Sequence, residues 1–448
     1  MKLTVIGLGY IGLPTSILFA ETGLVVTGYD IDAERVQRIN QCDPVINEPE
    51  LFVRLQAVLN QGTFRATTAL ASAEVFIIAV PTPITPDKQA DLQAVWAAAT
   101  ALVGVLKTGD LVVLESTVPV GTTKQLADFL QTQTGLQPGR DFSLAFSPER
   151  VLPGKIFYEL KHNARIVGGI DEQSGQRAQQ LFQMISLTTP AVTDCTTAEL
   201  VKLVENSARD TQLAFAYQVA NLARTADLDP YQVIRLANLH PRVQILTPTC
   251  GVGGHCIAVD PWFLVASFPQ STKLLRLVRE LNDQVPTEIL GLIDQQLQAV
   301  RLANAPITAT GTAAEPSVVL SSNTTQLQTD LDQFAEYRPA TVPLRVLVLG
   351  LAYKANSDDL RESPALKIAL TLQQRPDLAL TVCDPQIAPA NLAKYRFTQV
   401  LDYAELRPAQ LGHFDLIVLL VGHREFQSLL AEQARLTLPI LNYAGLEL

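Results

Sequence analysis

Residues 3–30 read LTVIGLGYIGLPTSILFAETGLVVTGYD, and this stretch decides the fold of the N-terminal part of the chain. The apolar run Leu3–Ile6 predicts a short buried strand, and residues 7–12 form a glycine-rich loop. Residues 14–21 have a helical pattern, and Leu24–Tyr29 predicts a second strand. Two strands joined by a helix make a βαβ unit, from which parallel α/β sheets are built.

The loop Gly7-Leu8-Gly9-Tyr10-Ile11-Gly12 has the G-x-G-x-x-G spacing of dinucleotide-binding folds. Its glycines let the backbone approach a pyrophosphate at the N-terminus of the following helix. Asp30 ends the second strand, eighteen residues after Gly12, where a carboxylate can accept hydrogen bonds from the adenosine ribose. Because a carboxylate there repels a 2′-phosphate, the pattern predicts NAD rather than NADP. The alternative is a tight strand-to-helix turn that binds no nucleotide.

Further buried-type strands are predicted at residues 75–80, 111–114, 142–146 and 165–167, with helical stretches between several of them. This order is typical of a doubly wound sheet, and we expect an NAD-binding Rossmann domain at residues 1–193. The loops after three of these strands read VPTP (80–83), ESTVP (115–119) and SPER (147–150). Ligands of open α/β sheets bind at the carboxyl ends of the strands, so these loops are candidates for nicotinamide and substrate contacts. Turn chemistry alone is the alternative for each loop.

The pattern becomes helical over residues 196–228, which predicts one helix of about 45 Å. Thr196 and Glu199 fit a capping box that would fix its start. A polar stripe at spacings i, i+4 and i+7 is formed by Lys202, Asn206 and Arg209. Such a stripe faces either a ligand or solvent. Because a helix of this length can join domains or carry a dimer interface, we expect a central helical dimerisation and catalytic domain at 194–303.

The C-terminal part repeats the opening pattern. Residues 304–342 are rich in Thr, Ala, Ser and Pro and predict a linker or insertion. Strands are expected at 344–349, 378–383, 416–421 and 440–443, with a helix opened by Ser363-Pro364. The similarity of VIGLGYIG to VLGLAYKA indicates two related halves. The predicted fold class is therefore α/β, with a second α/β nucleotide-binding domain at 343–448 after the helical region.

Composition limits the class of protein. The 448 residues are 48% hydrophobic and 17% charged, which argues against extensive disorder. A net charge of −10 weighs against nucleic acids and anionic membrane surfaces as partners. No membrane span or signal peptide is evident, so we expect a cytoplasmic protein without membrane insertion. Five scattered cysteines do not suit a disulfide framework.

One cysteine has unusual surroundings. Cys256 lies in Gly251-Val252-Gly253-Gly254-His255-Cys256-Ile257, with Asp260 just beyond. The default role of a single cysteine is that of a small buried apolar residue. Here the glycines would let a substrate approach the backbone, and the nearby imidazole and carboxylate can shape the reactivity of the thiol. A zinc site is disfavoured because no paired C-x-x-C motif or second histidine cluster accompanies it, and we expect no metal.

Together these motifs resemble the UDP-glucose/GDP-mannose dehydrogenase family. The matching segments, in chain order, are VIGLGYIGLP, AVPTP, LESTVPVGTT, FSPERVLPG, TAELVKLVEN, RLANLHPRVQI, GVGGHCIAVDPWF and DDLRESPA. The insertion at about 304–342 is longer than expected for the family, and the loop Thr247–Cys250 departs from its usual glycine-rich form.

The resemblance implies oxidation of a UDP-sugar C6 alcohol to a carboxylate with reduction of two NAD. It implies that Cys256 forms a thiohemiacetal and then a thioester. Lys202 would stabilise the oxyanion with Asn206 as a donor, while Asp260 would hold a water or orient Lys202. Glu149 and Thr117 would serve hydrolysis of the thioester.

The same resemblance implies the binding residues. Contacts to NAD are implied at Gly7, Gly9, Tyr10, Ile11, Gly12, Asp30, Arg35, Pro81, Thr82, Thr117 and Arg361. Contacts to the UDP-sugar are implied at Glu149, Arg150, Val151, Lys202, Asn206, Arg209, Arg242, Gly253, Tyr353 and Lys354. Arg242 would reach across a homodimer, and the C-terminal domain would bind UDP.

The expected substrate is UDP-N-acetyl-D-mannosamine, because the segment His240-Pro241-Arg242 resembles the group of members that oxidise it. UDP-N-acetylglucosamine and UDP-glucose remain alternatives. A two-electron dehydrogenase and a non-catalytic sensor of nucleotide-sugar or NAD are more distant ones, since neither needs the nucleophile Cys256.

Overall fold

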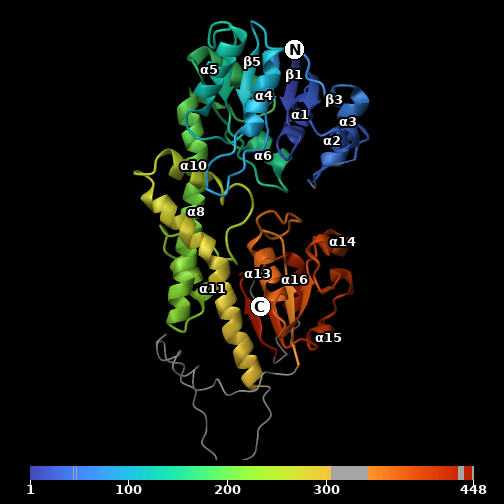
Figure 1. The fold of residues 1–448 in the computed structure, drawn as a ribbon, viewed down its shortest axis with the longest axis vertical. Coiled ribbons are helices and arrows are strands. Elements are labelled where there is room, and N and C mark those ends of the chain that lie inside the picture. Colours follow the sequence, from blue (N-terminus) through green and yellow to red (C-terminus); the bar gives the residue numbers. More distant parts are fainter. Residues whose placement is uncertain (44, 47, 304–341, 432–437, 446–448) are drawn as a thin grey trace, which may run out of the picture. The chain divides into compact units, whose positions relative to one another are not determined.

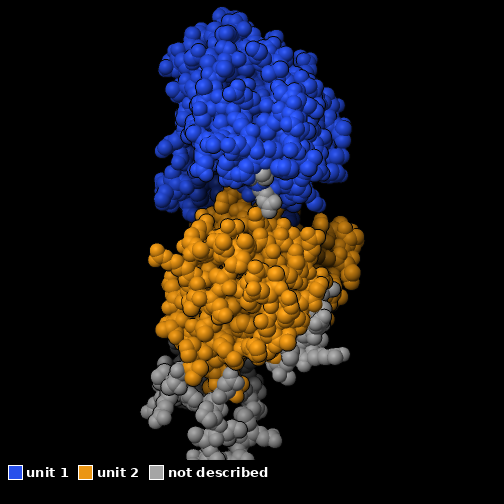
Figure 2. Space-filling view, turned by 90° about the vertical axis from the view of Figure 1, so that its right-hand side faces the viewer, with its two compact units in different colours: residues 1–209, 255–277 blue, residues 210–254, 278–448 orange. Residues whose placement is uncertain are grey.

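The computed structural model describes residues 1–43, 45–46, 48–303, 342–431 and 438–445. These residues form two compact units (Figures 1 and 2). Unit 1 comprises residues 1–209 and 255–277, and unit 2 comprises residues 210–254 and 278–448. The expected linker at 304–342 lies outside the described residues except for Val342.

Unit 1 contains an eight-stranded sheet in the order β3-β2-β1-β4-β5-β6-β7-β8. Its strands are β1 (Lys2–Ile6), β2 (Val25–Tyr29), β3 (Phe64–Thr67), β4 (Val75–Ile78), β5 (Leu111–Leu114), β6 (Ser143–Phe146), β7 (Ile166–Gly169) and β8 (Ala191–Asp194). Its helices are α1 (Gly12–Glu21), α2 (Ala33–Asn40), α3 (Leu51–Gln61), α4 (Gln93–Val103), α5 (Thr122–Thr134), α6 (Ile156–His162), α7 (Glu172–Gln183) and α10 (Asp260–Ser267). All neighbouring strands are parallel except β6 and β7.

Both faces of this sheet are covered, as a doubly wound fold requires. Along β4, Val75 and Ile77 pack into one apolar core with α1, α3 and α6. The alternate residues Phe76 and Ile78 pack into a second core with α4 and α5. Strands buried on two faces read as continuous apolar runs, which is why β4 and β5 were predictable from sequence.

Unit 2 contains a five-stranded parallel sheet in the order β11-β10-β9-β12-β13. Its strands are β9 (Leu344–Leu349), β10 (Leu378–Cys383), β11 (Gln399–Val400), β12 (Leu416–Leu419) and β13 (Ile440–Asn442). Its helices include α9 (Pro230–Ala237), α13 (Pro364–Gln373), α14 (Pro389–Leu392), α15 (Pro408–Leu411) and α16 (Arg424–Ala431), with 3-10 turns at Ala393–Tyr395 and Tyr403–Glu405. One sheet face packs against α11 and α13, and the other packs against α16.

Two 31-residue helices, α8 (Cys195–Thr225) and α11 (Lys273–Ala303), belong partly to each unit. The predicted long helix is thus confirmed, and so is the α/β fold class with a central helical region. The predicted capping box is wrong. Thr197 donates from its backbone and hydroxyl to Asp194, while Glu199 turns away to another helix. Asp194 lies before the apparent start of the helical pattern, so the pattern indicated Thr196 as the capping residue instead.

Candidate active site

The glycine loop between β1 and α1 has the conformation that a dinucleotide requires. Gly7 has φ +95°, and a Cβ at Gly12 would lie 1.8 Å from the Gly7 carbonyl oxygen, so both positions need glycine. A Cβ at Gly9 would meet no atom within 4 Å. The first glycine makes the turn, the third allows close packing, and the second leaves space for a pyrophosphate, as the NAD-binding fingerprint predicts. The residues present therefore fit NAD.

Asp30 lies at the end of β2 and holds this loop. Its carboxylate accepts from the backbone N–H of Leu8 at 2.9 Å and from that of Asp32 at 3.0 Å. Arg35 donates to the same carboxylate at 3.0 Å. Asp30 and Arg35 thus form one group beside the glycine loop, where the ribose was expected. Direct contact of either residue with NAD stays a prediction.

The loops after β4 and β5 are joined to each other. The hydroxyl of Thr82 donates to the carbonyl oxygen of Thr117 at 2.6 Å. Ser116 accepts from the backbone N–H of Val80 and donates to its carbonyl oxygen. The structure therefore brings the expected cofactor residues of these two loops, Pro81 among them, to one edge of the sheet.

A buried ion pair that sequence reasoning missed supports the same edge. Arg165 lies 3.0 Å from Glu115 and also donates to the hydroxyl of Ser147. The Arg165 guanidinium stacks 4.1 Å from the centre of the Phe182 ring. Burial raises the pKa of Glu115, although Arg165 opposes the shift. A charged residue directly after a buried strand was the available signal for Glu115, but its partner follows 50 residues later in the sequence.

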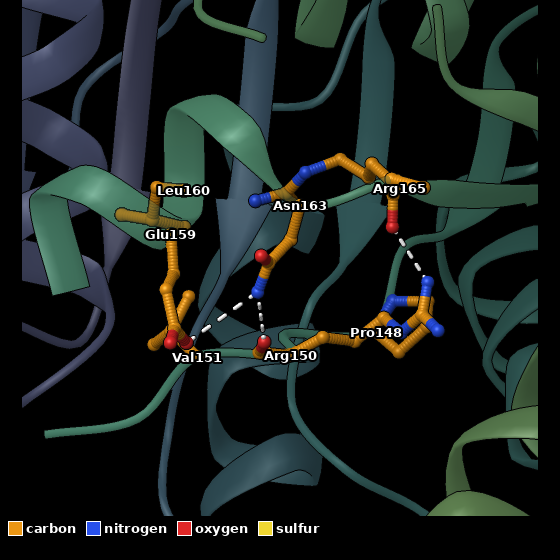
Figure 3. A pocket seen from close by; sticks show the side chains of 8 residues that line it. Pro148, Arg150, Val151, Glu159, Leu160, Asn163 and Arg165 are labelled. Atoms are coloured by element: carbon orange, nitrogen blue, oxygen red, sulfur yellow. Dashed lines mark hydrogen bonds between the residues drawn. The ribbon is translucent and has the colours of Figure 1, made fainter. Parts of the chain in front are cut away.

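Arg150 ties the loop after β6 to helix α8. Its guanidinium forms an ion pair with Glu205 and donates to the carbonyl oxygen of Ala164 at 2.6 Å. Asn163 in turn donates to the carbonyl oxygen of Arg150 at 2.9 Å. Figure 3 shows Arg150 and Asn163 among the side chains around a small pocket. The pocket is lined by Pro148, Arg150, Val151, Glu159, Leu160, Asn163, Ala164 and Arg165. The guanidinium is thus engaged by protein groups, and its expected substrate contact stays a prediction.

Helix α8 is fixed to the Rossmann part by Glu199, which the sequence pattern assigned to a local capping box instead. Glu199 is fully buried and accepts from the backbone N–H groups of Gly121 and Thr123 and from the Thr123 hydroxyl. These donors lie at the N-terminus of α5, so the carboxylate supplies a helix cap from a distant segment. The cap follows the loop that carries Thr117, so it holds α8 to that loop.

Lys202 is the centre of an acidic cluster in unit 1. It lies on α8 and is 5% exposed. Burial disfavours the charge of its ammonium group, but the surrounding groups outweigh that cost and raise the pKa of Lys202. Those groups, in decreasing order of effect, are Glu149, Asp260, Cys256 and Glu205. Lys202 is therefore a charged ammonium group beside a thiol and carboxylates.

Asn206 lies one turn further along α8 and donates to Asp260 at 2.5 Å. Burial raises the pKa of Asp260 to about 6, although Lys202 and Asn206 oppose the shift. Burial also raises the pKa of Glu149, against the attraction of Lys202, and the Glu149 carboxylate accepts from the backbone N–H of Val151. These carboxylates titrate nearer to neutral pH than exposed ones, which is common among groups that transfer protons.

The predicted stripe along α8 differs in one member. Lys202 and Asp210 are buried, and Asn206 between them is partly buried, so the inward face continues at spacing i+4. Arg209 is exposed. Asp210 rather than Arg209 is buried here because α11 packs on that side of α8, where Arg279 and Asn282 contact the Asp210 carboxylate. A substrate contact of Arg209 stays a prediction.

Cys256 lies one turn before α10. Its carbonyl oxygen accepts from the backbone N–H groups of Val259 and Asp260, at 3.0 and 2.8 Å. Leu203 of α8 packs against Val259 and Phe263 in a small apolar core. This packing holds the turn of Cys256 and the start of α10 against the part of α8 that carries Lys202.

The other cysteines have environments that suppress reactivity. Burial raises the pKa of the Cys250 and Cys383 thiols to about 12, and it raises the pKa of Cys195 and Cys42 as well. Cys256 is only partly buried and lies in the field of Lys202. Since the thiolate is the reactive form, the position of Cys256 beside Lys202 favours it over the other four cysteines, and its role as the nucleophile stays a prediction.

Unit 2 gives a second reason for the glycines that precede Cys256. A Cβ at Gly253 would lie 2.6 Å from Pro364 and 2.9 Å from Tyr353, and one at Gly254 would lie 2.9 Å from the Tyr353 ring. The backbone N–H of Gly254 donates to the carbonyl oxygen of Arg361. Close packing against residues 353–364 therefore requires these glycines, whereas the sequence suggested room for a substrate. Contact of Gly253 with substrate stays a prediction.

The first loop in the sheet of unit 2 has the same turn as the glycine loop of unit 1, with a glycine of positive φ and an aspartate that accepts from the loop backbone. Gly350 has φ +87°, and Asp384 at the end of β10 accepts from the backbone N–H of Leu351 at 2.7 Å. Alignment of the two loops places alanine at Ala352 and Ala355, where the first loop has its second and third glycines. The second sheet thus keeps the turn but lacks the full dinucleotide fingerprint.

The expected ligand residues of unit 2 lie on or near this loop. The Lys354 ammonium lies 5.5 Å from the centre of the Tyr353 ring, and Arg361 forms a bidentate ion pair with Asp359. Arg242 is exposed in the segment after α9. Their roles toward ligands stay predictions.

Comparison with known proteins decides the family. Three domains of the UDP-glucose/GDP-mannose dehydrogenase family match this sequence: the NAD binding domain at residues 1–186, the central domain at 196–284 and the UDP binding domain at 347–440. The chain belongs to the UDP-glucose/GDP-mannose dehydrogenase family. It is an NAD-dependent oxidoreductase that acts on a UDP-sugar.

Relatives cover almost the whole chain. The NDP-N-acetyl-D-galactosaminuronic acid dehydrogenase of Ralstonia solanacearum is 40% identical over 95% of this chain and 92% of its own. The UDP-N-acetyl-D-mannosamine dehydrogenase of Escherichia coli is 39% identical over 95% of this chain and 94% of its own. The structure of UDP-D-ManNAc dehydrogenase from Pyrococcus horikoshii superposes with a TM-score of 0.81 at 35% identity, covering 100% of this chain and 96% of that one.

Two further observations concern this family member. Among the described residues, no helix is both long and apolar enough to cross a membrane. The described part of the chain also holds no group of three or more His, Cys, Asp or Glu side chains arranged for a metal ion.

Proposed function

We propose that this protein oxidises UDP-N-acetyl-D-mannosamine at C6 to UDP-N-acetyl-D-mannosaminuronate. Support comes from the relatives of that name and from the cluster in unit 1 that joins Lys202, Asn206 and Asp260 to the turn of Cys256. This cluster carries the proposal, because a buried cation beside a thiol suits chemistry at a carbonyl carbon.

Cys256 is the proposed nucleophile. In the first oxidation the C6 alcohol loses a hydride and a proton and becomes an aldehyde. The Cys256 thiolate then adds to the aldehyde carbon, which forms a C–S bond and leaves an oxyanion on a thiohemiacetal. Loss of hydride from that carbon gives a thioester, and water then cleaves the C–S bond to release the acid and return the thiol. Bound NAD supplies the hydride acceptor in each of the two oxidations.

Lys202 and Asn206 are the proposed stabilisers of the oxygen that gains charge. The raised pKa of Lys202 keeps its ammonium protonated, so it can face a developing oxyanion without giving up its own proton. Asp260 orients both side chains, since it accepts from Asn206 and attracts Lys202. Glu149 and Thr117 serve the hydrolysis step, where the raised pKa of Glu149 suits proton transfer to or from water.

The remaining assignments concern binding. Tyr353 and Lys354 bind the UDP group, Arg361 contacts NAD, and Arg242 contacts the sugar from a partner subunit in a homodimer formed through α8. Exposed apolar side chains on α8, among them Phe215 and Leu222, support such an interface. The domain limits 1–193, 194–303 and 343–448 and a cytoplasmic location belong to the same proposal.

Reduction of NAD+ measured with four UDP-sugars side by side tests the substrate. We expect the highest kcat/KM with UDP-N-acetyl-D-mannosamine, compared with UDP-N-acetylglucosamine, UDP-glucose and UDP-N-acetylgalactosamine. The last is included because one relative is a galactosaminuronic acid dehydrogenase. Turnover confined to UDP-glucose, or a clear preference for the galactosamine derivative, would overturn this choice of substrate.

A further inference from the structure

A histidine that no motif marked lies at the ligand-binding edge of the C-terminal sheet. His423 follows β12 by four residues, and its side chain is fully buried. In this sheet β9 has β10 on one side and β12 on the other, so the strand order reverses between β9 and β12. Ligands of open α/β sheets bind at this switch point, beyond the carboxyl ends of the strands.

One hydrogen bond joins His423 to the loop after β9, and a second contact joins it to Asp384, which holds the same loop. The backbone N–H of Asn356 donates to Nδ1 at 3.0 Å. Nε2 lies 3.2 Å from Oδ2 of Asp384, the oxygen that also accepts from the backbone N–H of Leu351. Because Nδ1 accepts a hydrogen bond, we assign the ring hydrogen to Nε2, which faces the carboxylate.

The segment between these contacts carries the residues expected to bind UDP. Asp384 holds its beginning, at Leu351, and His423 holds its end, at Asn356, with Tyr353 and Lys354 between them. Asn356 has φ +55°, a left-handed conformation that asparagine adopts more readily than most residues other than glycine, and its side-chain oxygen accepts from the backbone N–H of Arg424. The histidine therefore accepts from the backbone of a turn residue whose side chain also contacts the start of α16, and both contacts hold this end of the loop.

The first sheet has a side chain at the position that corresponds to His423. Backbone N–H groups of Ala79 and Leu420 donate to Ile6 and Leu349, respectively, so these positions correspond in the two sheets. Thr82 lies three residues after Ala79, and His423 lies three residues after Leu420, so His423 is the counterpart of Thr82. The Thr82 hydroxyl also binds a loop, at Thr117, but that loop follows β5, whereas the loop bound by His423 follows β9, the counterpart of β1.

We propose that His423, with Asp384, positions residues 351–356 for binding the diphosphate-linked uridine of the substrate. The imidazole is fully buried, so it acts through the loop and is a positioning residue. This inference rests on the proposed function for the identity of the ligand. If the loop loses the acceptor for the Asn356 N–H, we expect UDP to bind about ten- to a hundredfold more weakly.

Calorimetry with UDP on the full-length protein, together with steady-state kinetics, tests the proposal. His423→Asn places its amide near Nδ1 and can still accept from Asn356, whereas His423→Gln places its amide near Nε2 and cannot. We expect the Asn variant to keep the Kd for UDP within about threefold. The Gln variant should raise this Kd, and KM for the UDP-sugar, by about tenfold or more, with kcat and KM for NAD+ little changed.

Leu419→Ala is the matched control, because Leu419 lies fully buried in the apolar core beside α16. It should lower the melting temperature but leave the Kd for UDP unchanged. Wild-type affinity in the Gln variant, or an equal loss in the Leu419→Ala control, would overturn the positioning role. Failure of the wild-type protein itself to bind UDP would instead overturn the proposed function.

Discussion

Replacing Asp260 by Asn should remove a pH dependence from catalysis. Burial raises the pKa of Asp260 to about 6, and its ionised form holds Asn206 and attracts Lys202. Protonation weakens both interactions, so the wild-type rate should fall on the acidic side. With this pKa the ionised fraction drops from about 91% at pH 7 to about 9% at pH 5, and kcat/KM should fall about tenfold.

The same shift predicts the sign of a stability effect. The folded pKa of Asp260 lies above its ordinary value of 3.8, so the fold favours the protonated form. Stability from this group is present below pH 3.8 and is lost as the pH rises through 6, by about 3 kcal/mol in total. Asp260→Asn should remove this loss, so its melting temperature should decrease less than that of wild type between pH 4 and pH 7.

The assay is kcat/KM for the UDP-sugar from pH 5 to pH 9 at saturating NAD+. We expect Asp260→Asn to be slower at pH 8 and to lack the acid limb near pH 6. Glu149→Gln is the companion variant, because the pKa of Glu149 is also raised. An unchanged acid limb in Asp260→Asn, especially with its disappearance in Glu149→Gln, would refute the assignment to Asp260.

Three further variants test other parts of the site. Lys202→Met should lower kcat by about 10²- to 10³-fold, because the cation facing the oxyanion is lost, and a rate within threefold of wild type would contradict this role. Gly9→Ala should keep the wild-type melting temperature but raise KM for NAD+ at least tenfold, whereas Gly12→Ala should lower the melting temperature; equal stabilities would argue against the loop geometry. Glu199→Ala removes three hydrogen bonds to the start of α5 and should cost about 2–4 kcal/mol of stability in denaturant unfolding, and an unchanged midpoint would show that this cap is unimportant.

The features predictable from sequence were those encoded locally. The glycine loop, Asp30 and the buried strands depend on neighbouring residues, and the structure places them within a few positions of the prediction. Strands β3, β8 and β11 were missed because each lies at the edge of its sheet and contains polar residues, so none reads as a continuous apolar run. The loops after β4, β5 and β6 were recognisable because topology alone brings the ends of parallel strands together.

The missed features depend on pairs of residues far apart in the chain. Glu199 matched a local capping pattern, yet its donors lie 76 and 78 residues earlier. Arg150 looked like a ligand for the substrate, and its partner Glu205 becomes visible only once α8 is packed. The need for glycine before Cys256 also comes from distant residues, since the side chains that leave no room for a Cβ belong to residues 353–364. No local pattern contains such contacts.

The ratio of NADH formed to UDP-sugar consumed tests the central claim most directly. A single thiol at Cys256 that retains the aldehyde and passes it on as a thioester predicts two NADH for each UDP-sugar, with the uronate as the product. Cys256→Ala should form no acid. A ratio of one NADH in the wild-type protein, or acid formation in Cys256→Ala at the wild-type rate, would contradict the account.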